Sequence, residues 1–594
     1  MPLGDLAKKL ALAVDVAQEA GQMLRAEFHR SGGPRGSGDH ADVDLEVERC
    51  IRARLLEAFP ESGYLGEETG STGMEPRPSF IWLVDPNDGT RNFLQGARGA
   101  SVSIGLLYER LPVLGVVYSP CAPDDSGDLF RWAEGCGPVT RNGVPLAPVS
   151  SPTTLQPDDR IALSQDVDQA PEATLRAAAP ARYLPLPSIA YRLALAAAGD
   201  ALVGSTVKGA RAWDYGGGHA LLRGVGAEFF DHEGATVRYS DVGMSQVGRC
   251  FGGPASVVPA LLGRPWDAIY GPAKAVADAH AFLPLTALER GRSVADPRLL
   301  SRAQGCLLGQ LAGDSLGYLL AATDPATRGQ RLTLEALELA DGGSPGPLAG
   351  QPSGASELAL ILGRCLVRSG RYDPSAVAEG YAYWRRETAL EPGDQSSVAL
   401  VRVGPLGIWG HRDAPDAVAD AARAYTALTD PRVLSQELSA AFAVAVAHAV
   451  GSGGTPHSVY DFTHDWLQRS GRSPEARRIL GAAADQGGAA ASLAPGPVEV
   501  AFRCAFHELL HASSAEEGIT RTLRRGGGMS ANAAAVGALL GAVHGRGSVP
   551  PGWRSAVLTA RPLQGLATVH CPRPMSLWPC DAMELAERLL LAGS

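Results

Sequence analysis

The sequence predicts a multidomain chain with a layered α/β (α+β) domain at its N-terminal end and an all-α domain at its C-terminal end. Its 594 residues exceed what one hydrophobic core usually holds. Helical patterns alternate with short strand-like runs up to about residue 265, and the strand-like runs stop after about residue 299. We therefore expect domains at 1–265 and 299–594, joined by a docked and mostly helical connector at 266–298.

Composition narrows the class of protein. Apolar residues make up 45% and charged residues 20%, which is typical of a globular protein. The formal net charge of −10 predicts no nucleic-acid partner and no anionic membrane surface. The nine cysteines are scattered without a C-x-x-C motif, which favours a reducing cytoplasm. No apolar run was expected to reach the length of a membrane span.

The N-terminal half is expected to combine three helices with paired strands. The run "TRNGVPL" also carries an Asn-Gly turn signal of the kind found in hairpins. Apolar residues recur at helical spacing in three segments and alternate or cluster in two strand-like segments. The expected helices are 3–28, 43–58 and 188–199, and the expected strands are 100–108 and 112–120.

The C-terminal half is expected to be a helical domain. Its apolar segments are rich in alanine and leucine and are separated by loops rich in glycine and proline. The most regular of these segments are 301–322, 355–370, 438–450 and 531–545.

The stretch "LVDPNDGT" at 83–90 places two aspartates next to a turn signal. Mg²⁺ prefers oxygen ligands. If a strand ends at Asp85 and the proline turns the chain, Asp85, Asp88 and the Asn87 carbonyl can face one ion. Gly89 and Thr90 would then offer backbone N–H groups to a phosphate at a helix start. A helix-capping turn alone would also explain the motif.

Other acidic residues strengthen the metal interpretation. Glu67 and Glu68 stand in "YLGEETG", Asp44 stands in "DHADVDLEVE", and Asp214 follows Trp213 at a glycine-rich helix entry. Carboxylates that converge without a cation repel one another and are costly to desolvate.

Together these pieces resemble the inositol monophosphatase family over about residues 5–265. The matching motifs are G-E-E at 66–68, D-P-x-D-G-T-x-N-F from Asp85 to Phe93, and W-D at 213–214. The resemblance implies a layered sandwich fold and a Mg²⁺-dependent, lithium-sensitive phosphomonoesterase that uses two or three Mg²⁺ ions on a small phosphorylated substrate.

The resemblance also implies roles for single residues. Glu67 and Thr90 would orient the attacking water, and Asp44 would act behind the ligands or at a third, weaker ion. Asp85 would bridge two ions. The implied metal ligands are Glu67, Asp85, the Asn87 carbonyl, Asp88 and Asp214.

Substrate identity stays open at this stage. Gly33, with Arg35 nearby, stands where many family members carry a lysine, and Val207 stands where inositol-selective members carry a glutamate. An inositol phosphate is the family default, but cations near Asp214 favour a 3'(2'),5'-bisphosphate nucleotide, NADP or a phosphorylated ADP-ribose. Those cations could equally be solvated. The expected substrate-binding residues are Gly89, Thr90, Ser188, Arg192, Lys208 and Arg211.

Residues 299–594 resemble the ADP-ribosylglycohydrolase family in three segments, 302–317, 401–410 and 515–553. That family is all-α, binds two Mg²⁺ ions and cleaves ADP-ribose from proteins or small molecules. Here the family's metal-binding aspartates are replaced, which predicts a pseudoenzyme without a bound metal. The replaced positions are Gly354, Ala355, Gly528 and Ser530.

Several alternatives remain for the whole chain. The C-terminal domain could bind an ADP-ribose-like ligand, dock a partner or stabilise the phosphatase. It could also be an active glycohydrolase with relocated ligands at Asp314, Glu357 or Glu516–Glu517. The whole chain could instead be a nucleotide sensor. Phosphatases of this family are often dimers, so a homodimer is a further expectation.

Overall fold

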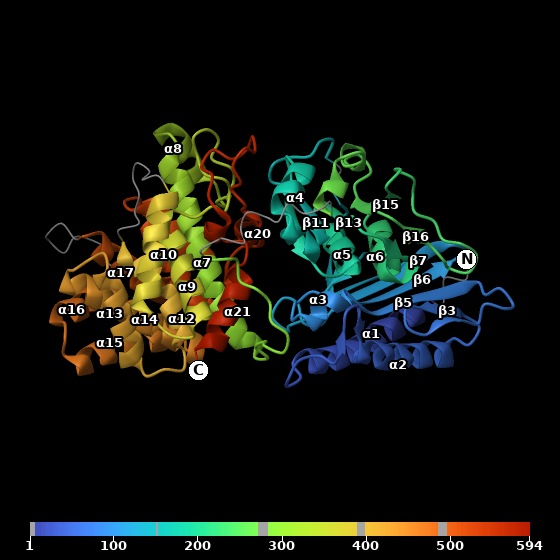
Figure 1. Cartoon of the computed structure of the whole chain (residues 1–594), viewed down its shortest axis with the longest axis horizontal. Coiled ribbons are helices and arrows are strands. Elements are labelled where there is room, and N and C mark those ends of the chain that lie inside the picture. Colours follow the sequence, from blue (N-terminus) through green and yellow to red (C-terminus); the bar gives the residue numbers. More distant parts are fainter. Residues whose placement is uncertain (1–5, 150–151, 271–282, 389–397, 485–495, 594) are drawn as a thin grey trace. The chain divides into compact units, whose positions relative to one another are not determined.

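The computed structural model describes residues 6–149, 152–270, 283–388, 398–484 and 496–593. The chain divides into two compact units (Figure 1). The N-terminal unit comprises Met1–Val276 and Leu288–Ala295, and the C-terminal unit comprises Ala277–Ala287 and Asp296–Ser594.

A large sheet forms the centre of the N-terminal unit. Its strand order is β10-β9-β8-β7-β6-β5-β3-β4, and all neighbours are antiparallel except β3 and β5. The strands are β3 (Gly63–Gly66), β4 (Gly70–Thr72), β5 (Phe80–Asp88), β6 (Ser101–Tyr108), β7 (Leu111–Ser119), β8 (Asp128–Ala133), β9 (Thr140–Arg141) and β10 (Val144–Pro145).

A second sheet has the strand order β12-β11-β13-β17-β15. Its strands are β11 (Arg160–Ser164), β12 (Arg182–Leu186), β13 (Val203–Thr206), β15 (Glu228–Asp231) and β17 (Cys250–Gly253). Two short ribbons complete the strands: β1 (Gly36–Ser37) pairs with β2 (His40–Ala41), and β14 (Ala210–Arg211) pairs with β16 (Gln246–Val247).

Helices alternate with these sheets in layers (Figure 1). Helices α1 (Leu6–Phe28) and α2 (Asp42–Ala58) cover one face of the large sheet. Helices α5 (Ile189–Ala198) and α6 (Ala212–Gly224) lie between the two sheets. The shorter helices are α3 (Thr90–Leu94) and α4 (Pro171–Ala178). The predicted layered sandwich is confirmed.

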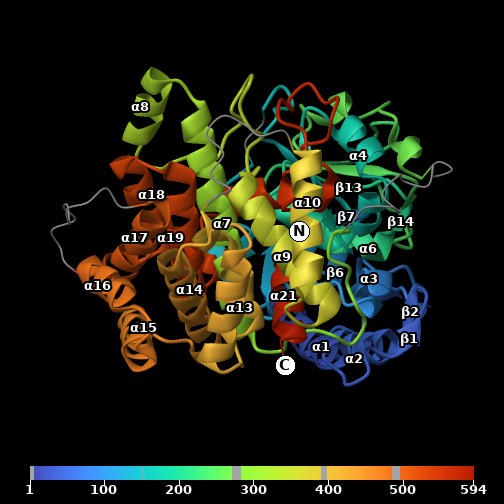
Figure 2. The same cartoon turned by 60° about the vertical axis from the view of Figure 1, so that its left-hand side comes forward.

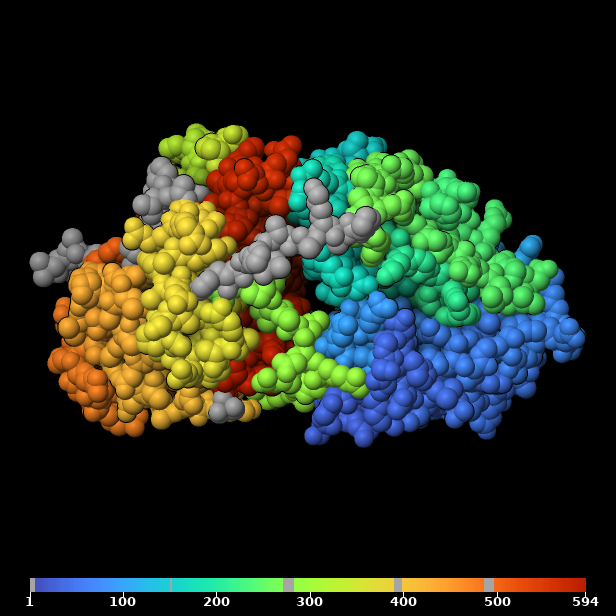
Figure 3. Space-filling view, in the orientation of Figure 1, coloured from blue at the N-terminus to red at the C-terminus, as the bar shows by residue number. Residues whose placement is uncertain are grey.

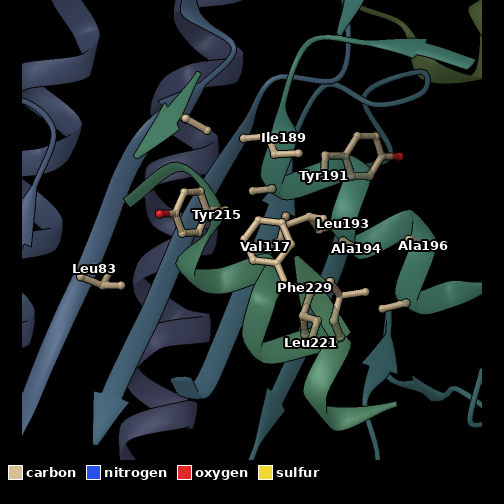
Figure 4. Packing of buried hydrophobic residues seen from close by; sticks show 14 of the residues in the cluster. Leu83, Val117, Ile189, Tyr191, Leu193, Ala194, Ala196, Tyr215, Leu221 and Phe229 are labelled. Carbon is tan, nitrogen blue, oxygen red and sulfur yellow. The ribbon is translucent and has the colours of Figure 1, made fainter. Parts of the chain in front are cut away.

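The inner core lies where α5 and α6 pack on the large sheet. Figure 4 shows Leu83 and Val117 of the sheet beside Tyr191, Leu193 and other apolar residues of the two helices. Glycines let α6 approach closely: a Cβ placed on Gly115 would lie 2.2 Å from the carbonyl oxygen of Gly217. Packing at this distance leaves no room for a methyl group.

The structure confirms most predicted elements of this unit. Helices α1, α2 and α5 match the predicted segments over their described residues, and Ser188 caps α5 by accepting the N–H of Tyr191. The Asn-Gly turn joins β9 to β10 with positive φ at both residues. The expectation that a strand ends at Asp85 is wrong, because β5 continues to Asp88 through a bulge.

The connector differs from its prediction. Trp266–Ile269 forms a 3₁₀ turn, residues 271–282 lie outside the described residues, and 283–296 form no helix. Pro284 lacks a backbone donor and Gly291 adopts a φ of 71°, neither of which suits a helix. The helical expectation is therefore wrong for 283–296, although part of this segment is docked on the N-terminal unit.

The described residues of the C-terminal unit form helices and contain no strand, as predicted (Figure 2). Its helices are α7 (Pro297–Ala322), α8 (Pro325–Thr333), α9 (Gly354–Ser369), α10 (Pro374–Glu387), α11 (Ala399–Arg402), α12 (Gly404–Trp409), α13 (Pro415–Ala427), α14 (Val433–Ser452), α15 (Pro456–Ser470), α16 (Pro474–Ala483), α17 (Pro497–His511), α18 (Ala515–Arg525), α19 (Met529–His544), α20 (Pro551–Thr559) and α21 (Ala582–Ala592).

Helix α14 is long and apolar enough to cross a membrane by length and composition, contrary to the sequence-based expectation. It is the one such helix among the described residues, and 78% of its apolar window is buried inside the protein. It packs against α12, α13, α15 and α19, which is the environment of a core helix.

Small residues join α7 to α19 at the centre of the C-terminal unit. A Cβ on Gly309 would lie 2.1 Å from the carbonyl oxygen of Gly537, and a Cβ on Gly305 would lie 2.3 Å from that of Gly541. The two backbones therefore touch without intervening side chains. This contact brings the C-terminal end of α7 to the start of α19.

We predict that Gly115→Ala and Gly309→Ala each destabilise their own unit by about 1–3 kcal/mol, because each adds a methyl group against a backbone carbonyl. Chemical unfolding followed by hydrogen exchange assigns the loss to a unit. The matched controls Gly248→Ala and Gly481→Ala add a Cβ to open space and should not destabilise either unit. Equal losses in controls and test variants would contradict the packing argument.

Candidate metal and phosphate site

Three carboxylates of the N-terminal unit come together from distant parts of the sequence. Glu67, Asp85 and Asp214 each offer an oxygen within 4.8 Å of the others. They come from the loop after β3, from β5 and from the first turn of α6. No other group of three or more His, Cys, Asp or Glu residues meets this criterion among the described residues.

A bulge in β5 positions the aspartates of the "DPND" motif. Asp85 pairs with Ser103 of β6, and Asp88 pairs with Ser101, so β5 has one extra residue between the two pairs. The N–H of Asn87 inside the bulge donates to Asp85 Oδ1 at 2.8 Å. Both aspartates are buried. The bulge, not a strand end, therefore places the two carboxylates.

Asp88 is held by the first turn of α5. Its Oδ2 accepts the Ser188 hydroxyl at 2.5 Å and the N–H of Ala190 at 2.7 Å. Ser188 is fully buried, and its hydroxyl also lies 2.8 Å from that of Ser101. The prediction that Ser188 binds substrate is therefore corrected: it positions Asp88.

Arg192 is also corrected. The prediction placed it beside the substrate, but it is only 3% exposed. Its Nε donates to the carbonyl of Ser188 at 2.9 Å, and its Nη1 donates to Ser164 Oγ and to the carbonyl of Ser205. A helix-face arginine looks the same in sequence whether it faces solvent or a neighbouring sheet. Here it joins α5 to β11 and β13.

Asp214 and the loop carrying Glu67 are held by backbone hydrogen bonds. Asp214 Oδ2 accepts the N–H of Arg211 at 2.7 Å, which fixes its carboxylate at the start of α6. The buried Glu48 accepts the N–H of Glu68 at 2.7 Å and that of Thr69 at 2.8 Å. The sequence reasoning missed Glu48. Its spacing of four residues from Asp44 on α2 was the available signal.

Asp44 is not one of the three converging carboxylates, but it contacts the "DPNDGT" segment. It accepts Asn87 Nδ2 at 3.0 Å, the Thr90 hydroxyl at 3.0 Å and, more weakly, the N–H of Ala41 at 3.3 Å. The Thr90 hydroxyl is also 2.9 Å from the Asn87 carbonyl. Burial raises the pKa of Asp44 to about 6, although these donors act in the opposite direction.

The electrostatics of the site disfavour four negative charges. Burial raises the pKa of Asp85 well above its usual value, and the nearby Glu67, Asp88 and Asp214 raise it further. Burial and then Asp88 do the same to Glu67 and Asp214. Burial also raises the pKa of Asp88. Protons or a cation are therefore needed to relieve the repulsion.

The donor set suits a hard divalent cation. It contains only oxygen atoms, which Mg²⁺ prefers. Asn87 Oδ1 is buried beside these carboxylates and has no hydrogen-bond partner among the described residues. The Asn87 carbonyl, the ligand that the sequence suggested, lies 2.9 Å from the Thr90 hydroxyl, whose one proton is donated either to it or to Asp44. A carbonyl oxygen has two lone pairs, so this contact leaves one for an ion. The residues present fit Mg²⁺ in chemistry and charge.

The predicted substrate cations lie at the surface near Asp214. Arg211 is exposed, and its guanidinium lies 5.4 Å from the Trp213 ring. Lys208 is exposed and lies 5.1 Å from the Tyr270 ring. Val207 is buried and offers no polar group to a ligand. Gly89 adopts a φ of 100° directly before α3, where Thr90 begins the helix.

In the C-terminal unit, the positions of the replaced aspartates lie at the starts of two helices. Gly354 and Ala355 begin α9, and Gly528 and Ser530 flank the start of α19. Asp314 of α7 accepts the N–H and the hydroxyl of Ser353 at 3.0 and 2.7 Å, so it caps α9.

Like Asp314, two other acidic residues considered as relocated ligands are engaged by neighbouring residues. Glu357 accepts Arg573 Nε at 2.6 Å and Trp384 Nε1 at 2.7 Å. Glu517 accepts the N–H and hydroxyl of Ser513, both at 2.7 Å, in the first turn of α18. None of the acidic residues Asp314, Glu357, Glu516 and Glu517 belongs to a cluster of potential metal ligands in the described part of the chain.

Comparison with known proteins agrees with both halves of the architecture. Residues 5–254 match the model of the inositol monophosphatase family, and residues 295–589 match that of ADP-ribosylglycohydrolase. The chain is 31% identical over 245 residues to "Inositol-1-monophosphatase ImpA" of Mycolicibacterium smegmatis, which covers 38% of this chain and 82% of that protein.

Other relatives match over shorter lengths. "Inositol monophosphatase 1" of Solanum lycopersicum is 36% identical over 159 residues, covering 26% of this chain and 55% of that protein. The chain thus spans about half the length of the first curated relatives it matches. The solved structure of inositol monophosphatase from Anabaena (Nostoc) sp. PCC 7120 matches with 25% identity and a TM-score of 0.35, covering 42% of this chain and 92% of that one.

For the first half, the motifs, the layered sandwich and the 82% coverage of the mycobacterial relative point to the same family. For the second half, the helical fold is consistent with the family model that it matches. The N-terminal half of the chain belongs to the inositol monophosphatase family, and its C-terminal half matches the model of ADP-ribosylglycohydrolase.

Proposed function

We propose that the N-terminal unit is a Mg²⁺-dependent phosphomonoesterase. One observation carries the proposal: Glu67, Asp85 and Asp214 offer oxygens within 4.8 Å of one another in the site that carries the family motifs. Glu67, Asp85, Asp88 and Asp214 would hold two Mg²⁺ ions, with Asn87 contributing an oxygen. A third, weaker ion near Asp44 would complete the set. When bound, Mg²⁺ offsets the charge of the phosphate and activates water.

The chain's own residues would orient the water and take its proton. Glu67 is exposed at the edge of the site, where its carboxylate can accept a hydrogen bond from water. When the Thr90 hydroxyl donates to Asp44, its oxygen can accept a second one. As the water oxygen bonds to phosphorus, the P–O bond to the ester oxygen breaks, the water proton passes to Thr90 Oγ and the Thr90 proton moves to Asp44. The leaving alcohol oxygen takes its proton from solvent. A base with a pKa of about 6 is suited to this transfer.

The substrate would be inositol monophosphate or a related small phosphate ester. The exposed Lys208 and Arg211 near Asp214 support a substrate that carries a further anionic group. A 3'(2'),5'-bisphosphate nucleotide, NADP or a phosphorylated ADP-ribose would provide one. A cytoplasmic location would suit the nine cysteines, which are all free.

We also propose that the C-terminal unit is catalytically inactive and acts in binding or docking. Glycine and alanine at positions 354, 355 and 528 offer no side-chain oxygen to Mg²⁺. Asp314 is occupied in capping α9, and Glu357 is paired with Arg573. An ADP-ribose-like ligand remains the class of molecule that its family fold suggests.

We predict that Asp85→Asn reduces phosphate release from inositol 1-phosphate by at least a thousandfold, because the shared carboxylate of the site is lost. A colorimetric phosphate assay at saturating Mg²⁺ measures this. Asp241→Asn removes an exposed carboxylate of the same unit and serves as the matched control. Full activity in Asp85→Asn would show that the site is wrongly assigned.

We predict that Mg²⁺ raises the thermal midpoint of the N-terminal unit, and that this rise grows between about pH 5 and pH 8. The folded-state pKa values of Asp44 and Asp85 are raised, so without metal the folded state keeps protons that the unfolded state releases. Without metal, the free energy of unfolding therefore falls as pH rises through this window. Mg²⁺ also displaces fewer protons from the site at higher pH, so its binding raises the thermal midpoint more.

Differential scanning calorimetry with and without Mg²⁺ checks this dependence. Asp85→Asn should raise the metal-free midpoint by removing a repelling charge and should also abolish most of the Mg²⁺-dependent rise. An identical response to Mg²⁺ in the wild type and the variant would argue against a metal at these residues.

We predict that the full-length protein releases no ADP-ribose from an ADP-ribosylated arginine substrate in the presence of Mg²⁺. The carboxylates needed to hold the metal are replaced or engaged in the C-terminal unit. Chromatography of the products after long incubation measures release. ADP-ribose release that disappears in Glu357→Gln would support relocated ligands and contradict the inactive assignment.

A further inference from the structure

The segment 288–295 lies between the two family matches, apart from its last residue, and belongs to the N-terminal unit. We call it the linker strand, although it pairs with no sheet. Gly33 adopts a φ of +88°, and a Cβ there would lie 2.7 Å from Arg290 Cγ and 3.0 Å from the Gly291 nitrogen. A Cβ on Gly96 would lie 2.9 Å from the carbonyl oxygen of Glu289. Any side chain at position 33 would therefore collide with the linker strand.

Polar contacts fix the far end of the linker strand. His29 Nδ1 lies 2.8 Å from the Ser293 hydroxyl, and Arg98 Nη2 donates to the carbonyl of Val294 at 2.8 Å. The buried Asp125 joins these two anchors, since it contacts His29 Nε2 at 2.9 Å and Arg98 Nη1 at 2.7 Å. The linker strand is therefore held along its length, and it lies on the visible surface beside the unit in Figure 3.

The linker strand closes one side of a cavity of about 480 Å³. We call this cavity the linker pocket. Two arginines from separate segments contribute to its wall, and none of its lining residues is acidic. Its lining residues include Ser37, Gly38, Arg91, Gln95, Leu288 and Arg290.

The segments that line the linker pocket are joined along the chain to the proposed catalytic residues. Arg91 follows Thr90 in α3, and the Thr90 hydroxyl donates to Asp44. Ser37 and Gly38 belong to the β1–β2 ribbon, which leads through Ala41 into α2 and Asp44. The linker pocket and the carboxylate site are therefore built on the same two segments of the chain, 37–44 and 85–91.

We propose that the linker pocket binds the second phosphate group of a bisphosphorylated substrate, with Arg91 and Arg290 as its cations. This inference rests on the phosphomonoesterase activity proposed above. Arginine binds phosphate through a planar set of donors, and two arginines match the charge of a phosphate group better than one. The linker between the two family domains would thus supply a specificity residue to the first.

Two carboxylates and one carbonyl compete with the ligand: Asp39 and the more distant Asp166, 3.8 Å away, contact Arg91, and Arg290 Nη2 donates to the carbonyl of Pro34. Asp39 accepts Arg91 Nε at 2.8 Å, but the Asp39 side chain is 75% exposed and that of Arg91 is 48% exposed. Exposed ion pairs of this kind contribute little stability, so a phosphate group can displace Asp39. Removing Asp39 should therefore strengthen the binding that removing Arg290 weakens.

The test compares matched substrates on the full-length chain. The kcat/KM of inositol 1,4-bisphosphate is divided by that of inositol 1-phosphate, and adenosine 3',5'-bisphosphate is likewise compared with adenosine 3'-phosphate. We expect Arg290→Gln to lower one of these ratios about tenfold through KM, and Asp39→Asn to raise the same ratio. Arg292→Gln, an exposed arginine of the same linker strand, is the matched control and should leave both ratios unchanged.

The outcomes separate this inference from the proposed function. If inositol 1-phosphate or adenosine 3'-phosphate is hydrolysed through Asp85 but Arg290→Gln and Asp39→Asn leave both ratios unchanged, only the inference is overturned. If no monoester is hydrolysed, the proposed function fails and the inference fails with it. If free inorganic phosphate stabilises the wild type but not Arg290→Gln while both ratios stay equal, the pocket binds an effector, which overturns the substrate assignment. Circular dichroism checks that each variant is folded.

Discussion

Mutual repulsion among converging carboxylates is the constraint on which the N-terminal unit depends. Each acidic residue of the site is held by a different element: Asp85 by the bulge, Asp88 by the start of α5, and Asp214 by the start of α6. Glu48 holds the loop that carries Glu67. These backbone donors keep like charges together although burial disfavours them. Such an arrangement lowers the stability of the fold when no cation is bound, and it favours the binding of a cation.

The described residues of the C-terminal unit contain no comparable group of converging carboxylates. The starts of α9 and α19 both contact α7, and they carry small residues at the positions of the replaced aspartates. The remaining buried acids have partners within the protein, as Glu357 has in Arg573. The backbone contacts between α7 and α19 require only small side chains. The packing of α7 on α19 therefore does not depend on acidic residues at these positions.

The sequence predicted what depends on local pattern and fixed spacing. Helices α1, α2 and α5, the Asn-Gly turn and the group of Glu67, Asp85 and Asp214 followed from periodicity and motifs. It could not show which face of α5 is covered, so Ser188 and Arg192 were assigned to the substrate although both lie inside the protein. Glu48 was missed because its role depends on a loop twenty residues away in the sequence.

Longer-range features were beyond such reasoning for the same reason. The linker pocket joins Ser37 to Arg290, and nothing in either local sequence indicates that they meet. Helix α14 passes the composition test for a membrane span because a core helix and a spanning helix are equally apolar. Only the packing of its neighbours distinguishes them.

The contact between Gly33 and the linker strand determines where the protein can be truncated to obtain its first half. A cut placed where the first family match ends, at residue 254, would remove Arg290 and Gly291 and expose the groove that accommodates them. The natural boundary of the first half lies beyond residue 295, immediately before α7. Fragments chosen by homology alone would thus lack residues of the interdomain segment that pack against the first half.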